Sequence, residues 1–255
     1  MLTRLFSAKP DRKLPDRQLR TSVLRGSPLL RKVDSDRLAA LEQTAAALLD
    51  QVEICGAEDF RLSQEMLWRI AMEAALVLSG PGLEACGDWR TLVVFADAFV
   101  HREPLQDEWG IVHTDASPRS GECWVNGPML ISWQDLLDAG PGYHVLVHEI
   151  AHRLDVGNGS MNGFPPLPRS MSQRDWTTAF SAAYDDHCQR VENKRPSAID
   201  PYGAESPEEF FAVCCESFFT DYTVLANWQP AVARLLVAYF QFTPLGQIYS
   251  KDSPW

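Results

Sequence analysis

The stretch His148-Glu149-Ile150-Ala151-His152 decides how this chain is interpreted. Residues four apart on an α-helix lie one above the other on the same face, so the two imidazoles can share a single ion. The glutamate emerges beside them, where a carboxylate can take a proton from a water held by that ion. The spacing therefore predicts a zinc site that activates water, with His148 and His152 as ligands and Glu149 as the general base.

The residues around this stretch favour a helix. Apolar side chains surround the polar ones from 145 to 154, Pro141-Gly142 is typical of a helix start, and the glycines at 157 and 159 are typical of a stop. The simpler alternative is an ordinary helix with two surface histidines and a solvated glutamate. The helical context and the complete set of zinc-site residues favour the metal site over this alternative.

A catalytic zinc site needs three protein ligands and an open position for water. The extended motif with a third histidine six residues after His152 is excluded, because Asn158 stands at that position and Asp155 replaces the required glycine. A carboxylate from a later helix is the remaining common solution. Glu209 and Glu216 are seven residues apart and share one helix face, and the residues alone leave the choice between them open.

A competing interpretation exists for Glu209. Ser206 stands three residues before it and Pro207 follows that serine, which together are typical of a capping box at the start of a helix. Glu208 points about 100° away from Glu209 around the helix and is a weaker candidate for the third ligand.

Two further features are expected to support the site. Asp155 follows His152 by three residues on the same helix face, where its carboxylate can accept the free imidazole N–H; alternatively it only ends the helix. The region 122–133 is expected to supply an edge strand along which a substrate backbone lies.

The whole chain of 255 residues indicates an α+β fold, in which a small mixed sheet precedes the motif helix and further helices follow it. No repeat or linker interrupts it, so we expect one catalytic domain over 29–255, with helices and sheet in 29–140 and the site helices in 141–255. The expected helices cover 34–52, 63–78, 172–190, 207–222 and 230–242, and the expected strands cover 91–95, 122–125 and 129–133.

Charge and composition exclude several classes of protein. The net charge of −11 argues against nonspecific nucleic-acid binding. The sequence has no run of eighteen apolar residues and no secretory signal, which predicts a cytoplasmic protein without a membrane span. The six cysteines form no C-x-x-C pair and are expected to be reduced. Residues 1–28 carry seven cations and two acidic residues, which predicts a basic, flexible N-terminal arm.

With these residues in view, the chain resembles the Mlc titration factor A family of bacterial zinc peptidases and is similar to the catalytic domain of anthrax lethal factor. The resemblance rests on Tyr202, Glu209 and Phe210-Phe211-Ala212 downstream of the paired histidines. It extends over most of the chain from about residue 30, and includes Gly110-Ile111-Val112-His113, the region 124–133 and Asp200-x-Tyr202.

The resemblance implies a zincin-like metallopeptidase fold with one zinc ion per chain. It implies that Glu209 is the third ligand and that Glu216 has a supporting role. It also implies that His113 reaches the metal in the resting state as a displaceable ligand, and that Tyr202 stabilises the developing oxyanion. From the residues alone, His113 is equally well an ordinary loop histidine, and Tyr202 an ordinary loop aromatic.

Two classes of function follow from the residues and the resemblance together. The first is a cytoplasmic zinc metallopeptidase, aminopeptidase-like, that hydrolyses peptide substrates with Glu149 as the base. The second, implied by the resemblance, is binding of the transcriptional repressor Mlc, which would affect the expression of glucose-transport genes. A non-catalytic repressor-binding protein with a structural zinc site is the alternative. The enzyme is favoured because a binding protein has no need of Glu149 beside the paired histidines.

Overall fold

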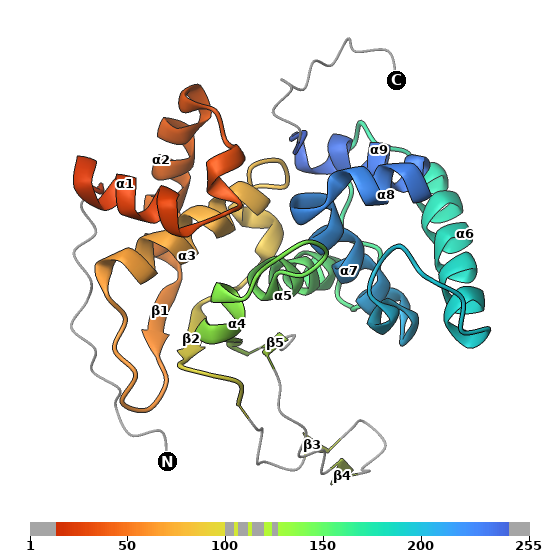
Figure 1. Ribbon diagram of the computed structural model, residues 1–255, viewed down its shortest axis with the longest axis horizontal. Helices are drawn as coiled ribbons and strands as arrows, with labels where there is room; N and C mark the ends of the chain where they lie inside the picture. Colours follow the sequence, from red (N-terminus) through yellow and green to blue (C-terminus); the bar gives the residue numbers. More distant parts are fainter. Residues whose placement is uncertain (1–13, 100–104, 107–111, 114–119, 124–126, 245–255) are drawn as a thin grey trace.

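The fold comes from a computed structural model that describes residues 14–99, 105–106, 112–113, 120–123 and 127–244. Helix α5 (Val145–Asp155), which carries the paired histidines, runs through its centre (Figure 1). The helices that precede it in the sequence lie on one side, and those that follow it lie on the other. The central helix therefore contacts both groups.

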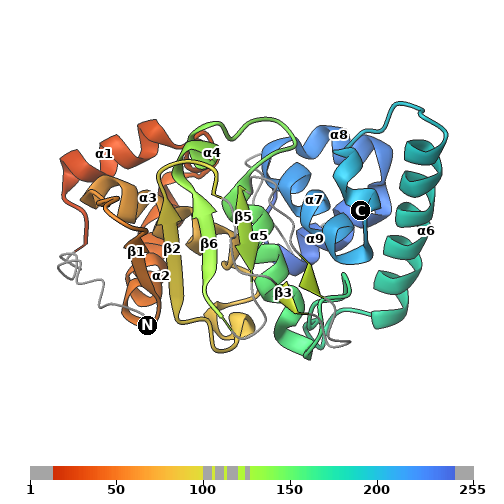
Figure 2. The ribbon, with the colours of Figure 1, turned by 90° about the horizontal axis from the view of Figure 1, so that it is seen from below.

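The main sheet has four strands in the order β1-β2-β6-β5. Strands β1 (Glu53–Gly56), β2 (Thr91–Phe95) and β6 (Met129–Ser132) are parallel, and β5 (Gly121–Cys123) pairs antiparallel with β6 at the edge (Figure 2). All four residues of β6 are buried, as expected for an inner strand. A separate antiparallel pair joins β3 (Leu105–Gln106) to β4 (Val112–His113). Of the region 122–133, expected to supply an edge strand, β5 lies at the edge of the sheet and beside α5, whereas β6 is an inner strand.

Eight further α-helices are present in the described residues, and side-chain caps account for the start of most of them. The side chains of Asp34, Ser63, Ser132, Ser172 and Ser206 each accept a hydrogen bond from a backbone N–H in the first helical turn. The helices are α1 (Arg17–Gly26), α2 (Ser35–Gln51), α3 (Gln64–Val77), α4 (Trp133–Leu137), α6 (Gln173–Glu192), α7 (Pro207–Thr220), α8 (Tyr222–Trp228) and α9 (Pro230–Phe240).

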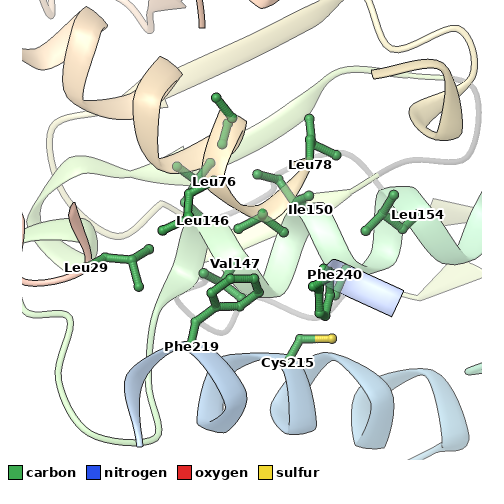
Figure 3. Packing of buried hydrophobic residues seen from close by; sticks show 14 of the residues in the cluster. Leu29, Leu76, Leu78, Leu146, Val147, Ile150, Leu154, Cys215, Phe219 and Phe240 are labelled. Atoms are coloured by element: carbon green, nitrogen blue, oxygen red, sulfur yellow. The ribbon is translucent and has the colours of Figure 1, made fainter. Parts of the chain in front are cut away.

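The core is continuous across both groups of helices, and α5 connects its parts. Its apolar side chains lie between Leu76 and Leu78 on one side and Phe219 and Phe240 on the other (Figure 3). Every residue of α5 except His148 is buried. Since burial of each large apolar side chain stabilises the fold by about 1.5–3 kcal/mol, this packing can offset the cost of the polar groups on the remaining face.

Residues 17–26 correct one prediction, because they form α1 rather than a flexible arm. The side chain of Asp16 caps this helix by accepting from Leu19 N at 2.8 Å, Val23 is fully buried, and Arg20 pairs with Glu42 of α2. The polar composition of the segment hid the apolar spacing that anchors it. The rest of the expected arm that precedes residue 14 lies outside the described residues.

Other elements also differ from the sequence prediction. Trp133, expected to end a strand, instead begins α4, and the helix expected over 230–242 ends at Phe240. Strand β1 was not expected, because its few apolar residues directly follow the end of α2. The helix expected over 207–222 ends at Thr220, and α8 begins after Asp221, whose ψ of 57° leaves the helical range. Among the described residues, no helix has both the length and the apolar character that crossing a membrane requires.

Candidate metal centre

Helix α5 begins four residues later than expected from Pro141-Gly142. His144 is its N-cap and accepts from Val147 N at 3.4 Å. The paired histidines then lie one turn apart on the face that borders a cavity, with 15% and 8% of their side chains exposed. The predicted side-by-side placement of His148 and His152 is present, with their Nε2 atoms 3.0 Å apart.

The third member of this group comes from the first turn of α7. Glu209 Oε2 lies 3.1 Å from His148 Nε2 and 3.4 Å from His152 Nε2. Ligands of a tetrahedral zinc ion with bonds of about 2.05 Å stand about 3.3 Å from one another, which is the separation of these three atoms. His148, His152 and Glu209 are, among the described residues, the cluster of metal-binding side-chain types close enough together to hold one ion.

The electrostatics of this group also fit a cation. Burial lowers the pKa of His148, but hydrogen bonds to Glu209 and Glu216 outweigh it and raise that pKa to about 10. Burial acts to raise the pKa of Glu209, whereas its hydrogen bonds to His148 and His152 lower it to about 2. The carboxylate therefore keeps its negative charge, and positive charge between it and the imidazoles is stabilised.

Glu216, the other candidate for the third ligand, lies behind His148. Its Oε1 is 2.8 Å from His148 Nδ1, and its Oε2 accepts from the backbone N of His144 at 2.5 Å. A carboxylate at Nδ1 fixes the proton there and leaves the Nε2 lone pair free to face a metal. Of the two candidates that the sequence left open, Glu209 is the one whose carboxylate faces both Nε2 atoms.

Glu149 projects into the same cavity and is 4% exposed. Burial raises the pKa of Glu149 to about 7, although the neighbouring histidines act in the opposite direction. A carboxyl group with this pKa can accept and release a proton near neutral pH. Gly121 of β5 lies against this carboxylate, since a Cβ at position 121 would overlap Glu149 Oε1.

Tyr202 lies in the 3₁₀ helix η4 (Pro201–Ala204), which Asp200 caps by accepting from Tyr202 N at 2.9 Å. Tyr202 is 45% exposed, and the centroid of its ring lies 6.0 Å from that of the His148 ring. Burial and the nearby Glu209 carboxylate raise the pKa of its hydroxyl, so the phenol stays protonated and able to donate a hydrogen bond. Tyr202 is thus at the cavity beside the histidines.

Asp155 has a different contact from the one expected. Its Oδ2 accepts from Asn162 N and Gly163 N, both at 2.7 Å, and no hydrogen bond joins it to His152 in the described part of the chain. Gly163, at φ 73°, lies against the carbonyl of Pro207, where a Cβ would overlap that oxygen. The carboxylate therefore fixes the loop that follows α5, and Gly163 of this loop packs against the start of α7.

The cavity has a volume of about 760 Å³, and β5 forms one wall of it. No lysine or arginine is among its described lining residues, whereas Glu122, Glu205 and Glu208 add carboxylates around the metal group. The side chain of His113 and residues 124–126 lie outside the described residues, so the expected fourth ligand and the end of the predicted edge strand are not part of this geometry.

Sequence reasoning missed Gly121 and the capping role of His144. A glycine in a short strand has no local signal that relates it to a residue 28 positions later. His144 precedes His148 by one turn, and histidine is not among the residues typical of an N-cap, so the sequence carries no signal of its capping role.

Comparisons with known proteins agree over nearly the whole chain. A family model described as glucose-regulated metallo-peptidase M90 matches residues 6–241, which includes 6–28 of the segment expected to be an arm. An uncharacterized protein of Synechocystis is 32% identical over 223 residues, which is 86% of this chain and 81% of that protein. The protein named Mlc titration factor A of Serratia proteamaculans is 30% identical over 227 residues (87% and 86%), and that of Escherichia fergusonii is 28% identical over 231 residues (89% and 87%).

Proposed function

Because the chain belongs to the glucose-regulated metallopeptidase M90 family, we propose that it is a zinc-dependent peptidase whose metal is held by His148, His152 and Glu209. The observation that carries this proposal is the convergence of two Nε2 atoms and one carboxylate oxygen within 3.4 Å of one another. Three protein ligands leave a fourth tetrahedral position open, which is typical of catalytic rather than structural zinc sites.

The metal, when bound, supplies a Lewis acid that polarises a peptide carbonyl and lowers the pKa of a water towards about 7. Glu149 accepts the proton of the attacking water and then donates it to the leaving amine. Its burial and its pKa of about 7 suit both transfers. Tyr202 donates its hydroxyl hydrogen to the oxyanion that develops on the substrate.

Strand β5 is the proposed docking edge for the substrate backbone. Among the described strands, it pairs with β6 alone, and Gly121, Glu122 and Cys123 all line the cavity. An extended peptide can add to such an edge through main-chain hydrogen bonds. The aminopeptidase-like preference for short substrates, and His113 as a displaceable ligand, rest on the family resemblance and belong to the same proposal.

Replacing Glu149 with Gln tests the enzymatic proposal. The amide keeps the size of the side chain but cannot accept a proton, so we expect zinc content and thermal stability to persist while hydrolysis of a fluorogenic peptide is lost. Glu208→Gln is the matched control, because it removes one cavity carboxylate that faces neither histidine. Unchanged turnover in Glu149→Gln would remove this residue from the mechanism.

A second role, binding of the transcriptional repressor Mlc, is proposed because two of the relatives are named Mlc titration factor A. The Glu149→Gln protein separates the two roles, since binding to purified Mlc should persist in it while hydrolysis is lost. A repressor-binding protein with a purely structural metal would instead show no hydrolysis in the unchanged chain.

A further inference from the structure

Outside the candidate site, three charged or titratable side chains form a buried cluster at the start of α5. Arg69 and Glu73 of α3 and His144 at the start of α5 are 4%, 0% and 2% exposed. Arg69 Nε donates to Glu73 Oε1 at 3.0 Å, and its Nη2 donates to the carbonyl of Leu136 at 3.0 Å. Glu73 Oε2 in turn lies 3.5 Å from His144 Nε2.

Stability alone is a weak reason for this arrangement. Removing charges from water is costly, and a buried ion pair often gains no stability over apolar side chains of similar volume. Around these residues α3 is otherwise apolar, and Ile70, Met72 and Ala74 are fully buried. An apolar pair at positions 69 and 73 would therefore continue the same core.

The contacts of His144 lead from this pair to the metal group. Its Nδ1 accepts from Val147 N, so the proton of the neutral ring is on Nε2, which faces Glu73. Its backbone N donates to Glu216, and the other oxygen of Glu216 contacts His148 Nδ1. One continuous path of polar contacts thus joins α3, the N-cap of α5, α7 and a candidate zinc ligand.

We propose that Arg69 and Glu73 are positioning residues for the metal centre. They fix the ring of His144 at the start of α5, and the backbone of His144 fixes the Glu216 carboxylate that orients His148. Neither residue contacts the metal group or the proposed substrate edge. This inference rests on the proposed zinc site, and it adds the residues that hold His148 in its metal-binding orientation.

The double variant Arg69→Met, Glu73→Leu tests the proposal. It removes both charges together and fills the space with apolar side chains, so no unpaired buried charge is left to unfold the protein. We expect the metal-free protein to fold with a lower melting temperature, because the Leu136 carbonyl loses its donor. The Kd for zinc, measured by competition with a chromophoric chelator, should rise about tenfold, at the low end of the range for outer-shell partners. A Kd within about twofold of wild type would overturn the proposal.

A second variant changes His144, which is the partner of Glu73 in this contact. His144→Asn keeps a good N-cap and the backbone N–H that Glu216 accepts from, but removes the ring that faces Glu73. We expect a similar rise in the Kd for zinc, and no further rise when the three substitutions are combined, because they break the same path. Full additivity, or an unchanged Kd in His144→Asn, would contradict the proposal.

Val232→Ala is the matched control for a general loss of folding stability. Val232 is fully buried in α9, and no residue of α9 lines the cavity in the described part of the chain. We expect this variant to lower the melting temperature and leave the Kd for zinc unchanged; an equal rise in Kd would overturn the proposal. If the wild-type chain binds no zinc, the proposed function itself fails, whereas an unchanged Kd in the variants removes only the positioning role.

Discussion

The two ends of the polar face of α7 carry the same residue type in different surroundings. Near its start, the Glu209 side chain is 19% exposed at the cavity and its oxygen faces two Nε2 atoms. Two turns later, the Glu216 side chain is 4% exposed and contacts His148 from the opposite side. Their seven-residue spacing places both on one face of the helix, so the difference between them comes from the elements packed against each turn.

This difference shows how one helix can supply both a ligand and its support. The early turn lies beside the cavity because the loop fixed by Asp155 contacts Pro207. The later turn lies under the start of α5, where a carboxylate finds the backbone N of His144 and the ring of His148. We therefore expect substitutions at the two turns to have different effects on the metal.

The largest effect is expected for Glu209→Gln. Because this change replaces the proposed ligand atom itself, the affinity for zinc should fall more than the roughly 10- to 100-fold that outer-shell substitutions cost. Equilibrium dialysis followed by elemental analysis measures the zinc affinity of the variant. Glu208→Gln, one residue earlier, should bind zinc like the wild type. Retained zinc in Glu209→Gln with loss in Glu208→Gln would reverse the assignment.

Gly121→Ala tests the proposed base without touching either turn of α7. The added methyl group would overlap Glu149 Oε1 and displace the carboxylate. Because a shift of about 1 Å in a catalytic group can cost about 100-fold in rate, we expect kcat to fall by roughly that factor while zinc content stays unchanged. A variant with wild-type kcat would show that this contact does not set the position of Glu149.

Glu216→Gln is expected to weaken zinc binding by about 10- to 100-fold, less than the change at Glu209. The amide has nearly the same shape but carries no charge to hold the proton on His148 Nδ1. Raising the zinc concentration should restore most of the activity, which would not occur in Glu149→Gln. An effect equal to that of Glu209→Gln would mean that the two turns do not differ in role.

The smallest effect concerns pH. In the metal-free protein the pKa of His148 is about 10, so the ring is protonated at pH 7 and zinc must displace that proton. The affinity for zinc should therefore rise about tenfold from pH 7 to pH 8, a range that lies below the pKa of His148. Titration calorimetry in buffers of different ionisation enthalpy counts the released protons. An affinity that is independent of pH over this range would contradict the charge state assigned to His148.

Local sequence patterns were sufficient to predict the motif helix, strand β2 and the start of α7. Ser206 does cap α7 through Glu209 N at 3.3 Å, as half of a capping box requires. The Glu209 side chain does not turn back to complete that box but faces the histidines. The helix cap uses the backbone N of Glu209 and the metal group uses its carboxylate, so one residue takes part in both.

The contacts that local sequence patterns could not predict depend on partners far away in the chain. Glu216 contacts residues 68 and 72 positions earlier, and no local periodicity relates them. Helix α1 is held by a fully buried valine and a charge pair with α2 in a segment whose composition is polar. Such contacts are decided by tertiary packing, whereas helix periods and caps are decided within a few residues.

The most direct test of the metal centre is anomalous scattering at the zinc absorption edge from crystals of the zinc-loaded protein. We expect one peak per chain, about 2.0–2.2 Å from Nε2 of His148, Nε2 of His152 and a carboxylate oxygen of Glu209. No peak at this position, or a zinc ion bound by other side chains while these three point apart, would contradict the account.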